Sequence, residues 1–373
     1  MTEIISRGPA DRRCRPVDQW PPQDRLSWQT ALQAGDPLEE SGCRAGHSRF
    51  SNRAMEKGYG RWLDWLTSKG LLSGQVAPGD RITPDRVKTY VADLERQNAS
   101  GTVITRLIEL KIMAAIMAPE TDWSWIYRVA SSIRARHKPA RPKRHRLVDI
   151  TRLLDLGIDL MVAAANESTG LRRFKAYRDG LMIALLASRA PRLRNLTGLI
   201  LGRTLVRRSD GWWIQIPAIE TKTKDPIETP WPEMLMSHLE TYLTDHRAGI
   251  VTLRGFSSGA SYDALWLSIY GLPMTDNGIY TRIVARTREG LGQPINPHLF
   301  RDCAATSIAI EDPAHVGIAS RLLGHRTGST TERYYNQARS IEASRLMQNH
   351  LLALRKSLNE HPDVDQFVTD SRR

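Results

Sequence analysis

Apolar residues recur at steps of three and four positions across residues 49–133, which is the spacing of amphipathic helices. Four turn signals separate the segments, namely Gly70, Pro78-Gly79, Thr83-Pro84 and Ser100-Gly101. The pattern predicts a small helical bundle. Its tryptophans, among them Trp62 and Trp65, are expected to lie in the core rather than on a base-stacking surface.

The pattern changes after residue 147. Trp212, Ile214 and Ile216 alternate with polar or outward positions, and Asp225-Pro226 marks a turn, so residues 211–231 predict two paired strands. Helical periodicity covers residues 147–165, 177–188, 233–247 and 276–290. The chain is therefore expected to be mostly α with a small antiparallel β-sheet.

Residues 297–338 predict three short helices. Asn296-Pro297 supplies a capping residue and a proline for the first helical position, and residues 311–313 should end that helix. A second helix stops at Gly324, and the capping box of Ser329 and Glu332 starts a third.

Four side chains in this stretch carry chemistry. His298 and Arg301 share the first turns of the first helix, where free backbone N–H groups favour an anion. His325 follows the second helix, and Tyr334 lies near the start of the third. Each has an ordinary alternative: a solvated helix face, a capping histidine, or a half-buried phenol. Their joint occurrence in a basic chain favours a phosphoryl-transfer site.

Composition narrows the class of partner. The chain has 373 residues, a formal net charge of +13 and a pI near 9.9, which indicates a polyanionic partner, with nucleic acid as the default candidate. No apolar run is long enough for a membrane span, and no signal-peptide core is present, so a cytoplasmic, nucleoid-associated protein is expected. Cys14, Cys43 and Cys303 are too scattered for a zinc site or a disulfide framework, and no metal is expected.

Two further segments differ from the rest. Residues 1–45 are rich in Pro, Gly, Asp and Arg without periodicity, and we expect them to be disordered. Residues 134–146 form a basic linker in which two prolines forbid a continuous helix. Its expected phosphate-contacting residues are Arg134, Arg136, Lys138, Arg141, Lys143, Arg144 and Arg146.

The motifs His298-Leu299-Phe300-Arg301, Leu323-Gly324-His325 and Thr330-Thr331-Glu332-Arg333-Tyr334 resemble those of the tyrosine recombinases of the phage integrase family. The likeness covers roughly residues 145–355 and includes the family's nine-residue step from the second histidine to the tyrosine.

The resemblance implies two more catalytic residues. Arg192 stands three positions before Asn195-Leu196 and matches the family's first catalytic arginine, with Arg189 and Arg194 as rivals. Asn195 replaces a carboxylate common in the family, and its amide can still accept a hydrogen bond. On the hairpin, Lys222 matches the family's lysine, and Lys224 remains an alternative that would also contact DNA.

In such an enzyme, Arg192 and Arg301 would clamp the phosphate oxygens, and His298 and His325 would add hydrogen bonds. Tyr334 would attack phosphorus while Lys222 protonates the departing 5′ oxygen, giving a 3′-phosphotyrosyl link without a metal or other cofactor.

The resemblance also implies an organisation. A core-binding (SAM-like) domain would cover residues 46–133, the α+β catalytic domain residues 147–358, and a flexible tail residues 359–373. The apolar helix face beyond Tyr334 either packs onto its own domain or docks into a neighbouring protomer. The expected enzyme is the integrase of a mobile element. It would act on double-stranded DNA as a tetramer that binds two duplexes, and a DNA-bending or directionality protein would be an optional partner. The alternatives are a type IB topoisomerase and a catalytically idle DNA-binding regulator.

Overall fold

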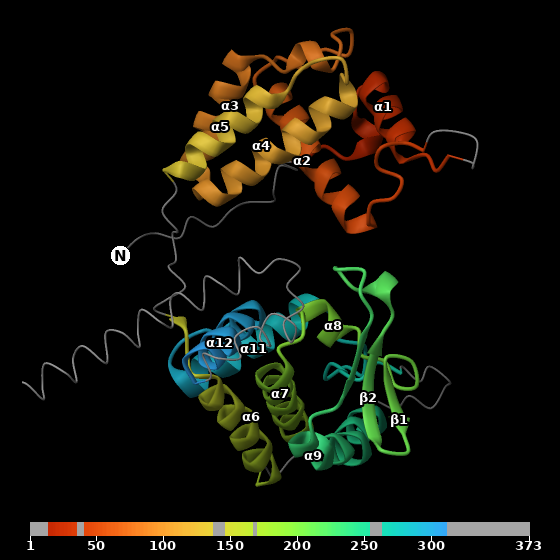
Figure 1. The fold of residues 1–373 in the computed structure, drawn as a ribbon, viewed down its shortest axis with the longest axis vertical. Helices are drawn as coiled ribbons and strands as arrows, with labels where there is room; N and C mark the ends of the chain where they lie inside the picture. The colour runs from red at the N-terminus through yellow and green to blue at the C-terminus, as the bar shows by residue number, and fades with distance from the viewer. Residues whose placement is uncertain (1–13, 36–40, 137–145, 167–169, 254–262, 312–373) are drawn as a thin grey trace, which may run out of the picture. The chain divides into compact units, whose positions relative to one another are not determined.

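The computed structural model describes residues 14–35, 41–136, 146–166, 170–253 and 263–311. The chain divides into two compact units, residues 1–142 and 143–373 (Figure 1). The described part of the chain is mostly helical with one small antiparallel sheet, as the periodicity predicts.

The first unit is a helical bundle. Its helices are α1 (Pro22–Leu32), α2 (Arg49–Ser68), α3 (Pro84–Gln97), α4 (Ser100–Met117) and α5 (Ser124–Ala135). Trp62 is fully buried and stacks on Trp65 with ring centroids 5.1 Å apart, while Tyr90 meets Trp62 edge to face. The prediction that these aromatic residues form core is therefore confirmed.

The expectation of disorder across residues 1–45 is wrong for the part that the structure describes. Helix α1 lies there, and Trp20 and Trp28 are only 3% and 1% exposed. Asp24 is also buried, where it accepts hydrogen bonds from the Tyr59 hydroxyl (2.6 Å) and from Arg81 (2.8 Å). Burial of the Trp20 and Trp28 indoles offsets the entropy cost of ordering this segment. The hydrogen-bond partners of Asp24 lie far along the sequence, so no local pattern indicates them.

In the second unit, α6 (Ile150–Ala165) and α7 (Gly170–Arg189) pack side by side. A β-carbon on Gly180 would lie 2.6 Å from the carbonyl oxygen of Gly157, so the two backbones approach too closely for any side chain between them. The remaining helices are α8 (Leu193–Thr197), α9 (Met236–Thr241), the π-helix Tyr242–Arg247, α10 (Ala248–Leu253), α11 (Asp276–Leu291) and α12 (Pro297–Glu311).

The sheet has the order β1-β2-β3, with β1 (Leu205–Arg208), β2 (Gly211–Ile216) and β3 (Ile227–Pro230). The predicted hairpin is confirmed, because β2 and β3 pair antiparallel with Ile216 opposite Ile227. Strand β1, which was not predicted from the sequence, joins β2 through the tight turn at Ser209-Asp210. Two adjacent arginines in a four-residue strand give no apolar alternation that would identify it.

His246 is buried in the second unit and stacks on Tyr177 with ring centroids 3.9 Å apart. Burial lowers the pKa of His246 to about 4. The native state therefore keeps this imidazole neutral while the unfolded chain takes up a proton below its ordinary pKa of about 6.5. The stabilisation that comes from the neutral imidazole should be fully present above the ordinary pKa of about 6.5 and should be lost as the pH falls toward 4.

We expect the free energy of unfolding to drop by ~1–2 kcal/mol between pH 7 and pH 5 because of this group. Urea unfolding at the two pH values measures it. The variant His246→Phe, which keeps a ring stacked on Tyr177, should lose most of that pH dependence. An unchanged dependence in the variant would assign it to other groups.

Candidate active site

A cavity of about 510 Å³ in the second unit collects residues from three separate parts of the chain. Residues 189–192 and Asn195 come from the end of α7 and from α8, and Thr223 and residues 225–229 come from the β2–β3 hairpin. Arg301 comes from α12. The apolar part of the wall is formed by Leu196, Leu199, Ile214, Ile216 and Ile227.

A sharp reversal of the backbone places Arg192. Helix α7 ends at Arg189, and Ala190 adopts the left-handed conformation with φ 45°. Arg192 is then extended and serves as the N-cap residue of α8. A left-handed alanine costs roughly 1–2 kcal/mol, so the surrounding packing must hold it in place.

Helix α12 places Arg301. Asn296 caps this helix, with its Oδ1 accepting a hydrogen bond from the Leu299 N–H at 3.0 Å, which confirms the predicted helix start. Arg301 is 7% exposed and donates from Nη1 to the carbonyl oxygen of Ala190. His298 lies one turn earlier and is exposed. The hydrogen bond to the carbonyl oxygen of Ala190 thus holds Arg301 at the wall of the cavity that Arg192 also lines.

Arg189 and Arg194, the alternatives to Arg192, occupy different positions in the structure. Arg194 lines a separate cavity of about 270 Å³ with Gly198, Glu220 and Asp276. Arg189 does line the larger cavity, but its Nη2 donates to the carbonyl oxygen of Pro230 at 3.1 Å and so links α7 to strand β3. Among these arginines, Arg192 and Arg301 are the pair best placed to grip one anion together.

Lys222 and Lys224 are both exposed in the connection between β2 and β3. Buried Thr221 shapes this connection, because its Oγ1 lies 2.8 Å from the carbonyl oxygen of Asp225 and 3.0 Å from that of Ala218. Lys224 adopts the left-handed conformation with φ 58°. The neighbours Thr223 and Asp225 line the cavity, so both lysines are adjacent in sequence to residues of its wall.

Several predicted residues lie outside the described residues. These are His325, Tyr334, the C-terminal apolar helix, Lys138, Arg141, Lys143 and Arg144.

The boundaries of the basic segment need correction. Arg134 belongs to α5, which continues to Ala135, and Arg136 follows directly; both side chains are exposed. Arg146 is part-buried and donates from Nη2 to the carbonyl oxygen of Pro294 at 2.8 Å. The ends of the predicted basic linker therefore belong to the folded units, and Arg146 is held by the turn that precedes α12.

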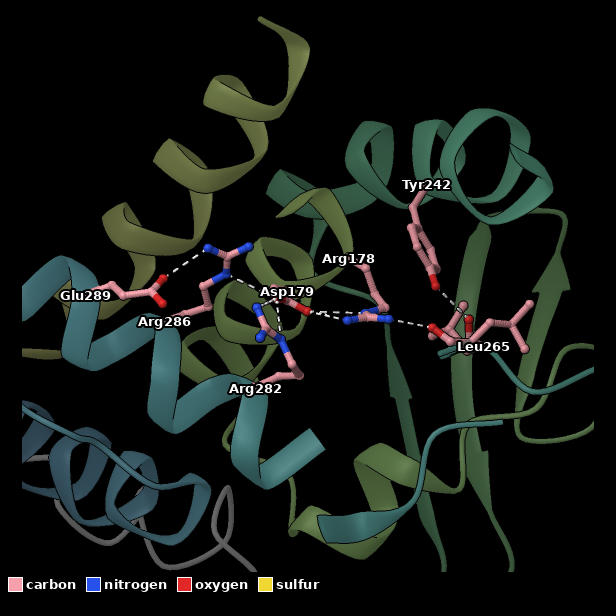
Figure 2. A network of polar contacts seen from close by, with 8 residues as sticks. Arg178, Asp179, Tyr242, Leu265, Arg282, Arg286 and Glu289 are labelled. Carbon is pink, nitrogen blue, oxygen red and sulfur yellow. Dashed lines mark hydrogen bonds and ion pairs between the residues drawn. The ribbon is translucent and has the colours of Figure 1, made fainter. Parts of the chain in front are cut away.

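A buried ion-pair network that was not predicted from the sequence is centred on Asp179, which is 1% exposed (Figure 2). One carboxylate oxygen accepts from Arg178 at 2.7 Å, and the other accepts from Arg282 at 2.7 Å and from Arg286 at 3.1 Å. Burial alone would raise the pKa of Asp179, but the guanidinium groups of Arg178 and Arg282 hold it below its ordinary value.

This network joins α7 to α11. Helix α7 leads into Ala190 and Arg192, and α11 leads into α12 and Arg301, so the network supports both sides of the cavity. The adjacent Arg178-Asp179 pair at the start of a long apolar run was the available signal.

Among the described residues, no group of three or more His, Cys, Asp or Glu side chains is arranged to hold a metal ion. None of the described helices combines the length and apolar character that crossing a membrane requires.

The sequence of this chain is similar to those of known proteins. A family model described as the phage integrase family matches residues 155–340. The tyrosine recombinase XerD of Chlorobaculum tepidum is 23% identical over 296 residues, covering 76% of this chain and 84% of that protein. Tyrosine recombinase XerD of Staphylococcus aureus is 25% identical over 227 residues, covering 58% of this chain and 72% of that protein.

Two solved structures have a similar fold. The XerH site-specific recombinase bound to difH substrate in a pre-cleavage complex has a TM-score of 0.54 at 13% identity, covering 89% of this chain and 98% of that chain. The post-cleavage complex with palindromic difH substrate has a TM-score of 0.55 at 11% identity, covering 90% and 99%. At these identities the likeness establishes the shared fold.

Proposed function

Because this chain belongs to the phage integrase family of tyrosine recombinases, we propose that it is a site-specific recombinase that cuts and rejoins DNA through a 3′-phosphotyrosyl intermediate. The observation that carries the proposal is the cavity that Arg192 and Arg301 both line, beside the hairpin that bears Lys222 and Lys224. Its biological role would be the integration or excision of a mobile element.

The two arginines would supply most of the electrostatic stabilisation. A phosphodiester repels nucleophiles, and the transition state spreads charge over its non-bridging oxygens. Planar guanidinium groups bind such oxygens in pairs, and a partly enclosed cavity strengthens the interaction relative to water. Arg301 suits this work because its hydrogen bond to Ala190 orients the group before substrate arrives.

The remaining steps are those that the resemblance to the tyrosine recombinases implies for the matching residues. Tyr334 would attack phosphorus as His298 takes the phenolic proton, forming the Tyr334 O–P bond while the P–O5′ bond breaks. Tyrosine has an ordinary pKa near 10, so cationic surroundings and a base are both needed. His325 would donate a hydrogen bond to a non-bridging oxygen, and Lys222 would protonate the departing 5′ oxygen. A 5′-hydroxyl of another strand then reverses the step.

DNA binding would depend on the basic surface of the chain and on the assembly of several protomers. Arg134, Arg136 and the lysines and arginines of residues 137–146 would contact phosphates without reading sequence, so affinity should fall steeply as salt rises. We propose a tetramer on two duplexes as the active assembly, with a DNA-bending accessory protein as an optional partner.

A suicide-substrate experiment tests the proposal. The protein is incubated with a pool of duplexes that carry randomised cores and a nick placed to release a short strand after cleavage. We expect a covalent complex that survives denaturation, and sequencing of the trapped DNA should yield a shared core. Peptide mapping should find the nucleotide on Tyr334. Binding without any covalent complex would favour the idle DNA-binding regulator, whereas relaxation of supercoiled plasmid without strand exchange would favour a topoisomerase.

Replacing Arg192 or Arg301 should slow cleavage far more than replacing the neighbouring Arg194. We expect Arg192→Ala and Arg301→Ala to slow single-turnover cleavage by about 10²–10³-fold, the usual effect of removing a group that stabilises transition-state charge. Arg194→Ala removes the same charge two residues away and should stay within about threefold, since Arg194 lines a different cavity. Thermal unfolding of each variant checks that the fold survives. A larger loss in Arg194→Ala than in Arg192→Ala would reverse the assignment.

A further inference from the structure

Ile219 is the most exposed of the large apolar side chains in the described part of the chain, with 92% of its surface accessible. It lies in the 3-10 turn Ala218–Glu220, within the connection between β2 and β3. An isoleucine is normally kept out of water, because burying such a side chain contributes about 1.5–3 kcal/mol. Its position at the tip of a polar connection therefore needs a reason.

The turn that carries Ile219 is firmly held. Glu220 pairs with Arg203 through two contacts, of 2.5 and 3.3 Å, which tie the turn to the loop before β1. On the other side, buried Thr221 bonds within the connection. The isoleucine is thus presented outward by a supported turn, and little conformational entropy would be lost when it enters a binding partner.

The surroundings of Ile219 indicate what that partner is. Lys222 and Lys224 are exposed within five residues of it, and Arg203 is half exposed beside Glu220. An apolar side chain flanked by cations suits the DNA minor groove, where apolar wedges enter between base steps while cations contact the phosphates. A second copy of this basic chain would meet the same lysines with like charge.

The distance to the proposed phosphate site is short. Thr223 lines the cavity with Arg192 and Arg301, and four residues of chain span at most ~14 Å. Since successive base pairs are ~3.4 Å apart, Ile219 would reach the duplex within about four base pairs of the part that lies against the cavity wall at Thr223.

We propose that Ile219 is a minor-groove wedge that unstacks a base step beside the cleaved phosphate. The inference rests on the proposed function, because it takes duplex DNA as the ligand of the cavity. Its expected role is to position the substrate: opening the step lets the backbone bend toward the arginines, and the cost of unstacking is offset by burial of the isoleucine.

The test uses the full chain with the duplex recovered in the suicide-substrate selection, carrying 2-aminopurine at positions within four base pairs of the cleaved bond. The non-cleaving variant Tyr334→Phe is the parent, so that fluorescence reports distortion alone. We expect binding to raise the fluorescence at one position, and Ile219→Ser added to this parent should remove the increase. Val162→Ser is the matched control, because Val162 is 57% exposed on α6, away from the hairpin.

A cleavage measurement in the wild-type background complements it. Ile219→Ser should cleave an intact duplex about tenfold more slowly, corresponding to the loss of one partly buried aliphatic side chain. A duplex with a mismatch at the responsive step, which is already unstacked, should restore the rate to within about twofold of wild type.

The outcomes separate the two proposals. Fluorescence that rises equally with and without the Ile219→Ser substitution overturns the wedge, as does a cleavage defect that the mismatch leaves in place; the latter would indicate a contact between protomers. Absence of any covalent complex with wild-type protein defeats the proposed function. In that case, duplexes recovered by binding alone, with 2-aminopurine placed in turn at each position of their shared core, still give the fluorescence result, because it requires no cleavage.

Discussion

Replacing Tyr334 by phenylalanine should abolish the covalent protein–DNA complex, with a loss in cleavage of at least about 10³-fold, because the variant has no oxygen to attack phosphorus. Tyr335→Phe is the matched control: it makes the same chemical change at the adjacent residue of the Tyr334-Tyr335 pair. It should retain cleavage within about threefold. Single-turnover cleavage of the suicide duplex, read on a denaturing gel, measures both variants.

Affinity for the duplex should be nearly unchanged in Tyr334→Phe, since the lost hydroxyl is one neutral group among many cationic contacts. Gel-shift titration at two salt concentrations separates binding from chemistry. If Tyr334→Phe still formed the adduct and Tyr335→Phe did not, the nucleophile would be Tyr335 and the spacing from His325 would be ten residues.

Asp179→Asn should lower the free energy of unfolding by about 3–5 kcal/mol, the largest effect on stability that we expect from one substitution. Asparagine keeps the shape of the side chain but leaves Arg178, Arg282 and Arg286 converging on a neutral amide. Arg178 is itself buried and cannot turn to solvent. Urea unfolding at neutral pH measures the loss.

Glu289→Gln is the control for Asp179→Asn. It also removes one carboxylate from the same network, but Glu289 is 61% exposed and touches only the outer guanidinium of Arg286 at 3.0 Å (Figure 2). Its cost should be below about 1 kcal/mol. Equal losses in the two variants would mean that burial does not govern the network.

The pH dependence supplies a second check on Asp179. The pKa of Asp179 in the folded protein lies below its ordinary value, so its contribution is present above about pH 4 and is lost as the pH falls through the lowered pKa. The difference in stability between wild type and Asp179→Asn should therefore shrink in acid. A constant difference down to pH 2 would contradict the assignment.

Local sequence signals predicted the elements that carry the candidate site. Asn296-Pro297 marks the start of α12 correctly, because capping and the fixed φ of proline act within one turn. The alternation of Ile214 and Ile216 and the Asp225-Pro226 turn identify the β2–β3 hairpin for the same reason. Periodicity failed where few residues carry it, as in β1 and α1.

The sequence by itself determined the helical class, the hairpin, the basic character and the spacing of the motif, since each depends on neighbouring residues or on summed composition. Only the tertiary structure decided that Arg192, rather than Arg194, lies on the same cavity as Arg301. That choice depends on the left-handed backbone at Ala190 and on a hydrogen bond between residues 111 positions apart. The ion pairs of Asp179 that join α7 to α11 support this arrangement, and contacts of such separation leave no periodic trace in the chain.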